Sequence, residues 1–116
     1  MPKYAVLLYR LEAEQPQPGT PASQQLYQAW GEFNRNVAQA GVLTSGTGLH
    51  PSATATSVRV REGKTLITDG PFAETHEQLG GVLLFDCTDL DEAIVWASKV
   101  PDAQYGCIEL RPVWEA

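Results

Sequence analysis

The clearest structural signal in the chain is 81-GVLLFDC-87, an apolar run that is followed closely by 89-DLDEAIVWASKVP-101. The first run is apolar at almost every position, as a buried β-strand is. The second begins with Asp89, whose carboxylate caps free helix amides, and has Glu92 three positions later, as in a capping box. We therefore expect a strand followed by a helix that stops before Pro101. The apolar face predicted for this helix consists of Leu90, Ala93, Ile94 and Ala97.

A similar strand and helix come earlier in the chain. Residues 3-KYAVLLY-9 form a short apolar strand, and the proline-rich loop 12-EAEQPQPGTP-21 follows it. Thr20 and Pro21 are suited to begin a helix, and Gly41 is suited to end it. The apolar stripe of this helix, which we interpret as core, consists of Leu26, Trp30, Phe33, Val37 and Ala40.

The other segments complete an α+β order. The remaining strand-like segments are 42–51, 56–61, 64–69 and 105–113. The middle two flank Glu62-Gly63, which predicts a hairpin. The order strand, helix, strand, hairpin, strand, helix, strand predicts a ferredoxin-like sandwich with an inserted β-hairpin and both helices on one face of an antiparallel sheet. A chain of 116 residues has room for one domain, residues 1–116.

The second face of this sheet has no layer of its own to cover it. Leu7, Val58, Val60 and the strand 82-VLLF-85 are too apolar to face water. We therefore expect a homodimer whose two sheets pack face to face, with a pocket where polar side chains interrupt the packing.

Composition excludes several classes of function. The net charge of −6, with only eight Lys and Arg, disfavours nucleic acid and anionic membranes as partners. The apolar run near the N-terminus is too short for a signal peptide or a membrane span, so we expect a cytoplasmic protein. Cys87 and Cys107 lie in separate strands and are expected to be reduced thiols. No metal site is expected, because no spaced pair of ligands on one helix supports one. No cofactor is expected either, and 44-TSGTGL-49 lacks the third glycine and the following helix of a dinucleotide fingerprint.

The run 66-LITDGPFAETHEQLGGVLLFD-86, with 89–101 and 108-IELRPV-113, resembles the DGPF family within the YCII-related group over residues 3–113. The resemblance implies a dimeric α+β barrel of ferredoxin-like subunits. For the YCII-related group it implies a suspected enzymatic activity through a His and Asp pair in a cleft, and for DGPF members a link to the pathway of a sigma factor. The family usually has lysine where this sequence has His76, so a positive charge there depends on pH.

Within this run, the segment 69-DGPFAETHE-77, here called the motif, divides into two parts. In 69-DGPF-72, Asp69 bonds downstream amides, Gly70 permits unusual dihedral angles, the proline fixes one φ angle and Phe72 is expected to anchor the loop in the core. The following 74-ETHE-77 is harder to explain by structure alone. On a helical turn its two glutamates would be neighbours, an arrangement that a proton-transfer site uses.

Two hypotheses of function therefore remain open. The first, slightly favoured, is a homodimeric small-ligand-binding or accessory module in which the motif is structural. The alternative is a small-molecule enzyme with a His/Asp acid-base pair in the cleft between subunits. The candidate catalytic residues are His50, Asp69, Glu74 and His76, and the candidate substrate-binding residues are Arg59, Glu77 and Arg111.

Overall fold

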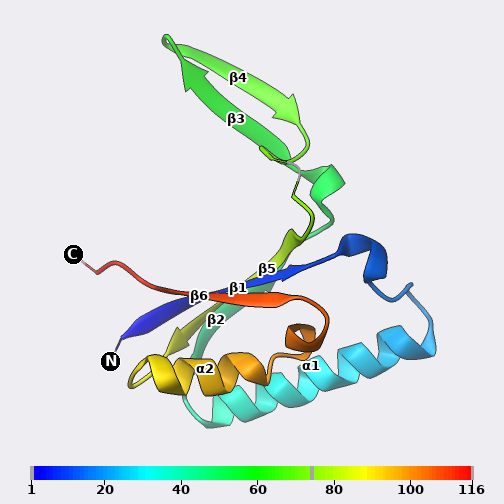
Figure 1. Ribbon diagram of the computed structural model, residues 1–116, viewed down its shortest axis with the longest axis vertical. Helices are drawn as coiled ribbons and strands as arrows, with labels where there is room; N and C mark the ends of the chain where they lie inside the picture. The colour runs from blue at the N-terminus through cyan, green and yellow to red at the C-terminus, as the bar shows by residue number, and fades with distance from the viewer. Residues whose placement is uncertain (1, 74, 116) are drawn as a thin grey trace.

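An antiparallel sheet of four strands forms the body of the protein and carries both α-helices on one face (Figure 1). The computed structural model describes residues 2–73 and 75–115. The strands of this sheet lie in the order β2-β5-β1-β6, and each neighbouring pair is antiparallel. This arrangement confirms the predicted α+β class. The four strands are β1 (Lys3–Arg10), β2 (Leu43–Gly48), β5 (Gln78–Asp86) and β6 (Cys107–Pro112).

The first helix, α1 (Pro21–Gln39), has the two ends that the sequence predicts. Thr20 Oγ1 accepts a hydrogen bond from the Ser23 amide at 3.2 Å, and Pro21 occupies the first turn, where its missing amide hydrogen is not needed. Just beyond the helix, Gly41 has a φ of 72°, a conformation that glycine adopts without steric cost.

The second helix, α2 (Leu90–Ser98), begins with a reciprocal cap. Asp89 Oδ1 accepts a hydrogen bond from the Glu92 amide at 2.9 Å, and Glu92 Oε1 accepts one from the Thr88 amide at 2.8 Å. Three short 3₁₀ helices complete the helical structure that is described: η1 (Glu12–Glu14), η2 (Ser52–Thr54) and η3 (Pro101–Gln104).

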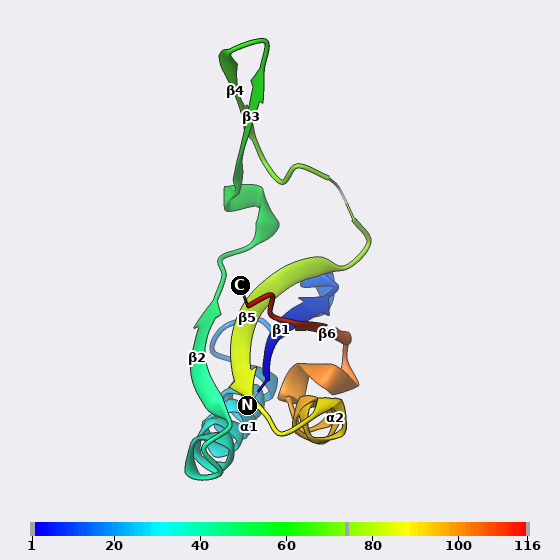
Figure 2. The same ribbon diagram turned by 90° about the vertical axis from the view of Figure 1, so that its left-hand side faces the viewer.

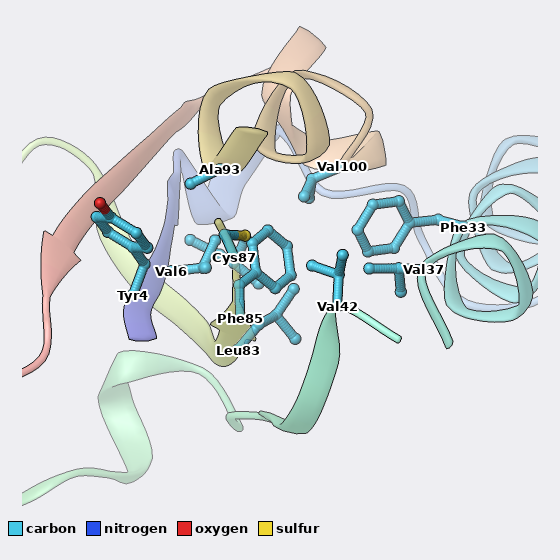
Figure 3. Close-up of a cluster of buried hydrophobic side chains, with 11 residues drawn as sticks. Tyr4, Val6, Phe33, Val37, Val42, Leu83, Phe85, Cys87, Ala93 and Val100 are labelled. Carbon is cyan, nitrogen blue, oxygen red and sulfur yellow. The ribbon is translucent and has the colours of Figure 1, made fainter. Parts of the chain in front are cut away.

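The core lies between the helices and the sheet (Figure 3). On β1, Val6 is opposite Leu83 of β5 and Leu110 of β6, so every second residue of these strands faces the helices. The largest of the fully buried side chains are those of Val6, Val37, Phe85, Cys87 and Val100.

The face that α2 turns to the sheet differs from the predicted one. Ala93 and Ala97 are buried, but Leu90 and Ile94 are about half exposed, and Trp96 packs against the core instead. The small alanine side chains let the helix approach the sheet closely. The buried face is therefore centred on the two alanines, and the prediction was wrong for Leu90 and Ile94. On α1, Phe33 and Val37 are buried as expected, whereas Ala40 is exposed.

The predicted hairpin is present and projects away from the body (Figures 1 and 2). It consists of β3 (Thr56–Arg61) and β4 (Lys64–Asp69), which pair only with each other. At its tip Glu62 has a φ of 53° and Gly63 a φ of 75°, as a tight turn with two left-handed residues requires.

The two cysteines differ in a way that labelling can test. Cys87 is buried in the core, and this burial, with Glu92 and Asp86 nearby, raises the pKa of its thiol to about 11. Cys107 is exposed. With a thiol reagent at pH 8 we expect one fast-reacting thiol per folded chain, and a second only in denaturant. Cys107→Ser should abolish the fast reaction, and two fast thiols in the folded protein would contradict the placement of Cys87.

Candidate functional site

A groove lies on the helix-covered side of the sheet, between α1 and the strands β2 and β5. Its volume is about 720 Å³, within the range of small-molecule binding sites. We call it the α1 groove, and its principal side chains are those of Leu8, Leu26, Trp30, Leu43, Leu83 and Asp102.

The floor of the α1 groove consists largely of glycine. Gly46 and Gly48 of β2 line it, and Gly48 pairs directly with Gly81 of β5. A Cβ atom on Gly46 would lie 2.5 Å from Leu83 Cδ2, and one on Gly81 would lie 2.9 Å from Leu8 Cδ1, whereas one on Gly48 would meet nothing within 4 Å. The first two glycines therefore admit the leucines of the core, and Gly48 leaves empty space. Since glycine weakens a strand and no neighbouring side chain requires it at Gly48, this position points to a close approach by another group.

A buried polar cluster closes one end of the α1 groove. Arg10, at the end of β1, is only 3% exposed, and its Nη1 lies 3.5 Å from Asp102 Oδ1. Trp30 Nε1 donates a hydrogen bond to the same oxygen at 3.3 Å. Arg10 Nη2 donates to the Glu14 carbonyl at 3.2 Å, and the guanidinium lies 5.1 Å from the centre of the Tyr105 ring. These contacts fix Trp30 and Asp102 as the polar end of an otherwise apolar site.

Sequence reasoning missed this cluster, although one signal was present. Tyr4, Val6 and Leu8 alternate along β1, and the same period places Arg10 on the core face. Asp102 follows Pro101 in η3, where no periodic pattern marks it.

A cavity of about 150 Å³ adjoins the α1 groove and contains His50. It shares Gln15, Leu49 and Gly80 with the groove, and Arg10 forms part of its wall. The loop of His50 is held in place by Glu12, because its carboxylate accepts hydrogen bonds from both the amide and the hydroxyl of Ser52, each at 2.6 Å. His50 is itself exposed, and it lines this small cavity together with the buried Arg10.

The other candidate residues lie elsewhere. Arg59 and Asp69 are exposed on the projecting hairpin. His76 is exposed in the loop before β5, and Glu77, the last residue of that loop, is half-buried. None of them lines the cavity of His50 in the described part of the chain. Arg111 lies on β6, where a 2.9 Å contact between its Nε and Glu109 Oε2 raises its pKa. Glu74 falls outside the described residues.

The start of the motif fastens the base of the hairpin. Gly70 has a φ of 97°, its amide donates to the Ala55 carbonyl at 2.7 Å, and its carbonyl accepts from Ser57 Oγ at 2.8 Å. Phe72, however, is 80% exposed, so the expectation that it anchors the loop in the core was wrong. The chain leaves the hairpin there, beyond the reach of the core between sheet and helices. No helical turn occurs among the described residues from 71 to 77.

Metal ligation and membrane crossing are two other roles to consider for residues 2–73 and 75–115. These residues contain no group of three or more His, Cys, Asp or Glu side chains placed to hold a metal ion. None of the helices described there is both long and apolar enough to cross a membrane.

Comparison with known proteins shows the family of the chain and leaves its activity open. The family model for the YCII-related domain matches residues 2–116. The chain belongs to the YCII-related family. An uncharacterized protein of Rhizobium meliloti (strain 1021) is 36% identical over 112 residues, which cover 95% of this chain and 90% of that protein. Neither the family model nor this relative names a reaction for the YCII-related chain.

Proposed function

We propose that this YCII-related protein is a homodimeric module that binds a small ligand in the α1 groove. The observation that carries the proposal is a groove of about 720 Å³ beside a fixed polar cluster, in whose floor Gly48 leaves space that a side chain could fill. A chain that only needed a packed core would place larger residues there, since strand glycines lower stability by roughly 0.5–1 kcal/mol each.

The lining indicates the chemistry of the ligand. Leucine side chains and the Trp30 ring form most of the wall. Asp102 is the one charged side chain among the described lining residues, and Arg10 already opposes its charge. We therefore propose a small, largely apolar or aromatic molecule with a hydrogen-bonding group that meets Asp102 and Trp30.

The finer fold and the dimer are part of the same proposal. The strand order β2-β5-β1-β6 with both helices on one side supports a ferredoxin-like sandwich with an inserted hairpin. The opposite face carries Leu7, Val82 and Leu84, which are half-buried in a single chain. A second copy packed on this face would complete a dimeric α+β barrel. Membership of the DGPF subtype, a single domain, a cytoplasmic location and a link to the pathway of a sigma factor stay predictions.

A Gly48→Val variant tests the site without disturbing the core. Because a side chain at Gly48 points into empty space, we expect the free protein to remain as stable as wild type, and ligand affinity to fall by at least about tenfold. Ligands would be found in a thermal-shift screen of small apolar and aromatic metabolites, where saturation at a hundred times the dissociation constant adds about 2.7 kcal/mol.

Gly31→Ala is the matched control, because its added methyl group would contact only Arg35 Nη1, at 3.7 Å, and lies outside the groove. It should bind every hit as wild type does. Equal binding of the hits by wild type and Gly48→Val would place the ligand elsewhere and refute the proposal.

An enzymatic role is the second candidate, and the position of His50 favours it. This histidine and the buried Arg10 line a small cavity that shares Gln15, Leu49 and Gly80 with the α1 groove. An acid-base role for His50 predicts that His50→Gln abolishes turnover of a bound ligand while its affinity changes little. Unchanged turnover in that variant would exclude His50 as the acid or base.

A further inference from the structure

The shape of the chain shows that it exposes more surface than a self-contained domain. Its accessible surface is 8146 Å² and its radius of gyration is 16.2 Å. A compact monomer of 12.6 kDa would expose about 6,200 Å² and have a radius of gyration of about 13 Å. The excess of roughly 1,900 Å² is larger than the area of about 800 Å² that each partner buries in a standard interface.

Much of this excess belongs to the β3–β4 hairpin. Figures 1 and 2, which are related by a quarter turn, both show it standing clear of the body. Val58 is opposite Ile67, and these side chains are 60% and 68% exposed. Val60 lies on the same side of the hairpin and is also mostly exposed. Isolated two-stranded hairpins are marginally stable in water, so this one needs a surface to pack on.

The charges of the chain favour a second copy as that surface. Residues 56–69 contain three cations and two carboxylates, a net charge of +1. The other residues contain five cations and twelve carboxylates, so the hairpin is attracted to the rest of an identical chain. An exposed apolar hairpin and an uncovered apolar sheet face on one chain also permit reciprocal contacts about a two-fold axis.

We propose that the β3–β4 hairpin is an arm that packs against a second copy of the chain. The side of the arm that contacts the second copy, at the margin of the facing sheets, carries Val58, Val60 and Ile67. The arm of the second copy makes the same contact in return. The inference rests on the proposed homodimer and specifies how it is held together. The arm follows β2 after the short helix η2 and precedes β5 in the chain, so dimerisation would also restrain the strands that form the floor of the α1 groove.

Sedimentation equilibrium of the full-length protein tests the arm. Val58→Thr with Ile67→Thr keeps the branched side chains that strands favour and removes apolar contacts in both copies, so the dimer dissociation constant should rise by at least about tenfold. The control is Leu66→Thr, on the opposite side of the hairpin, which should change it by less than about twofold.

The outcomes separate the arm from the dimer itself. A dimer that is equally tight in the double variant would overturn the arm and leave the homodimer standing. A wild-type protein that stays monomeric would overturn both. If Leu66→Thr raised the dimer dissociation constant as much as the double variant does, the contact would not lie on the side of the hairpin that carries Val58 and Ile67. Hydrogen exchange provides a second readout that needs no variant: amides of residues 56–69 should be protected in the dimer and exchange freely when the protein is diluted to monomer. Identical exchange in both states would also overturn the arm.

Discussion

Gly106→Ala should lower the free energy of unfolding by at least about 3 kcal/mol. Gly106 leads into β6 where that strand meets the end of β1. An added Cβ would overlap the carbonyl oxygen of Tyr9 and would lie 2.8 Å from Arg10 Cβ and 2.9 Å from Arg10 Cα. Most of these are backbone atoms that no side-chain rotation can move, so the two strands would have to separate.

Urea denaturation of the purified variant measures this loss, with Gly48→Ala as the control because its methyl group meets no neighbour within 4 Å. The control should match wild type or exceed it by up to about 0.5–1 kcal/mol, the gain expected from replacing a strand glycine. A Gly106→Ala protein within about 0.5 kcal/mol of wild type would show that β6 does not approach β1 as described.

Asp102→Ala should have the second large effect, a loss of about 3 kcal/mol, because it leaves the Arg10 charge buried without its carboxylate. The separation of 3.5 Å between Arg10 Nη1 and Asp102 Oδ1 is long for an ion pair, which places the loss at the lower end of the usual range for a broken buried pair. The variant also removes the acceptor of the Trp30 indole hydrogen bond.

A double-mutant cycle separates these effects. Replacing Arg10 with methionine in the Asp102→Ala background removes the unpaired charge, so the double variant should be more stable than Asp102→Ala alone. A double variant whose loss equals the sum of the two single losses would mean that Arg10 and Asp102 do not interact. The measurement is the free energy of unfolding in urea at pH 7.

Local signals in the sequence predicted the elements of the fold well. Thr20, Gly41 and Asp89 mark helix ends through contacts with their immediate neighbours in the chain, and Glu62-Gly63 sets its turn in the same way. The face of α2 was harder to predict, because Leu90 and Ile94 satisfy the helical period as well as the buried Ala93 and Ala97 do. Only the distance between helix and sheet decides between the two faces.

The site was largely beyond prediction because it depends on contacts across the sheet. Gly48 and Gly81 are 33 residues apart and form one floor only through the register of β2 with β5. The sequence also indicated that His50 and Asp69 each end a strand-like run, but not whether those ends meet. Asp69 ends β4 of the projecting hairpin and lines neither the groove nor the cavity of His50, whereas His50 and Arg10 line one cavity.

Nuclear magnetic resonance of the tryptophan indoles tests most directly whether ligands occupy the α1 groove. The chain has three tryptophans, and Trp30 lines the groove, Trp96 lies on α2 and the exposed Trp114 follows β6. Titration of the ¹⁵N-labelled protein with a hit from the thermal-shift screen should move the Trp30 indole signal, whose N–H bonds Asp102, and leave the other two in place. Shifts of Trp96 or Trp114 with an unmoved Trp30 signal would contradict the account.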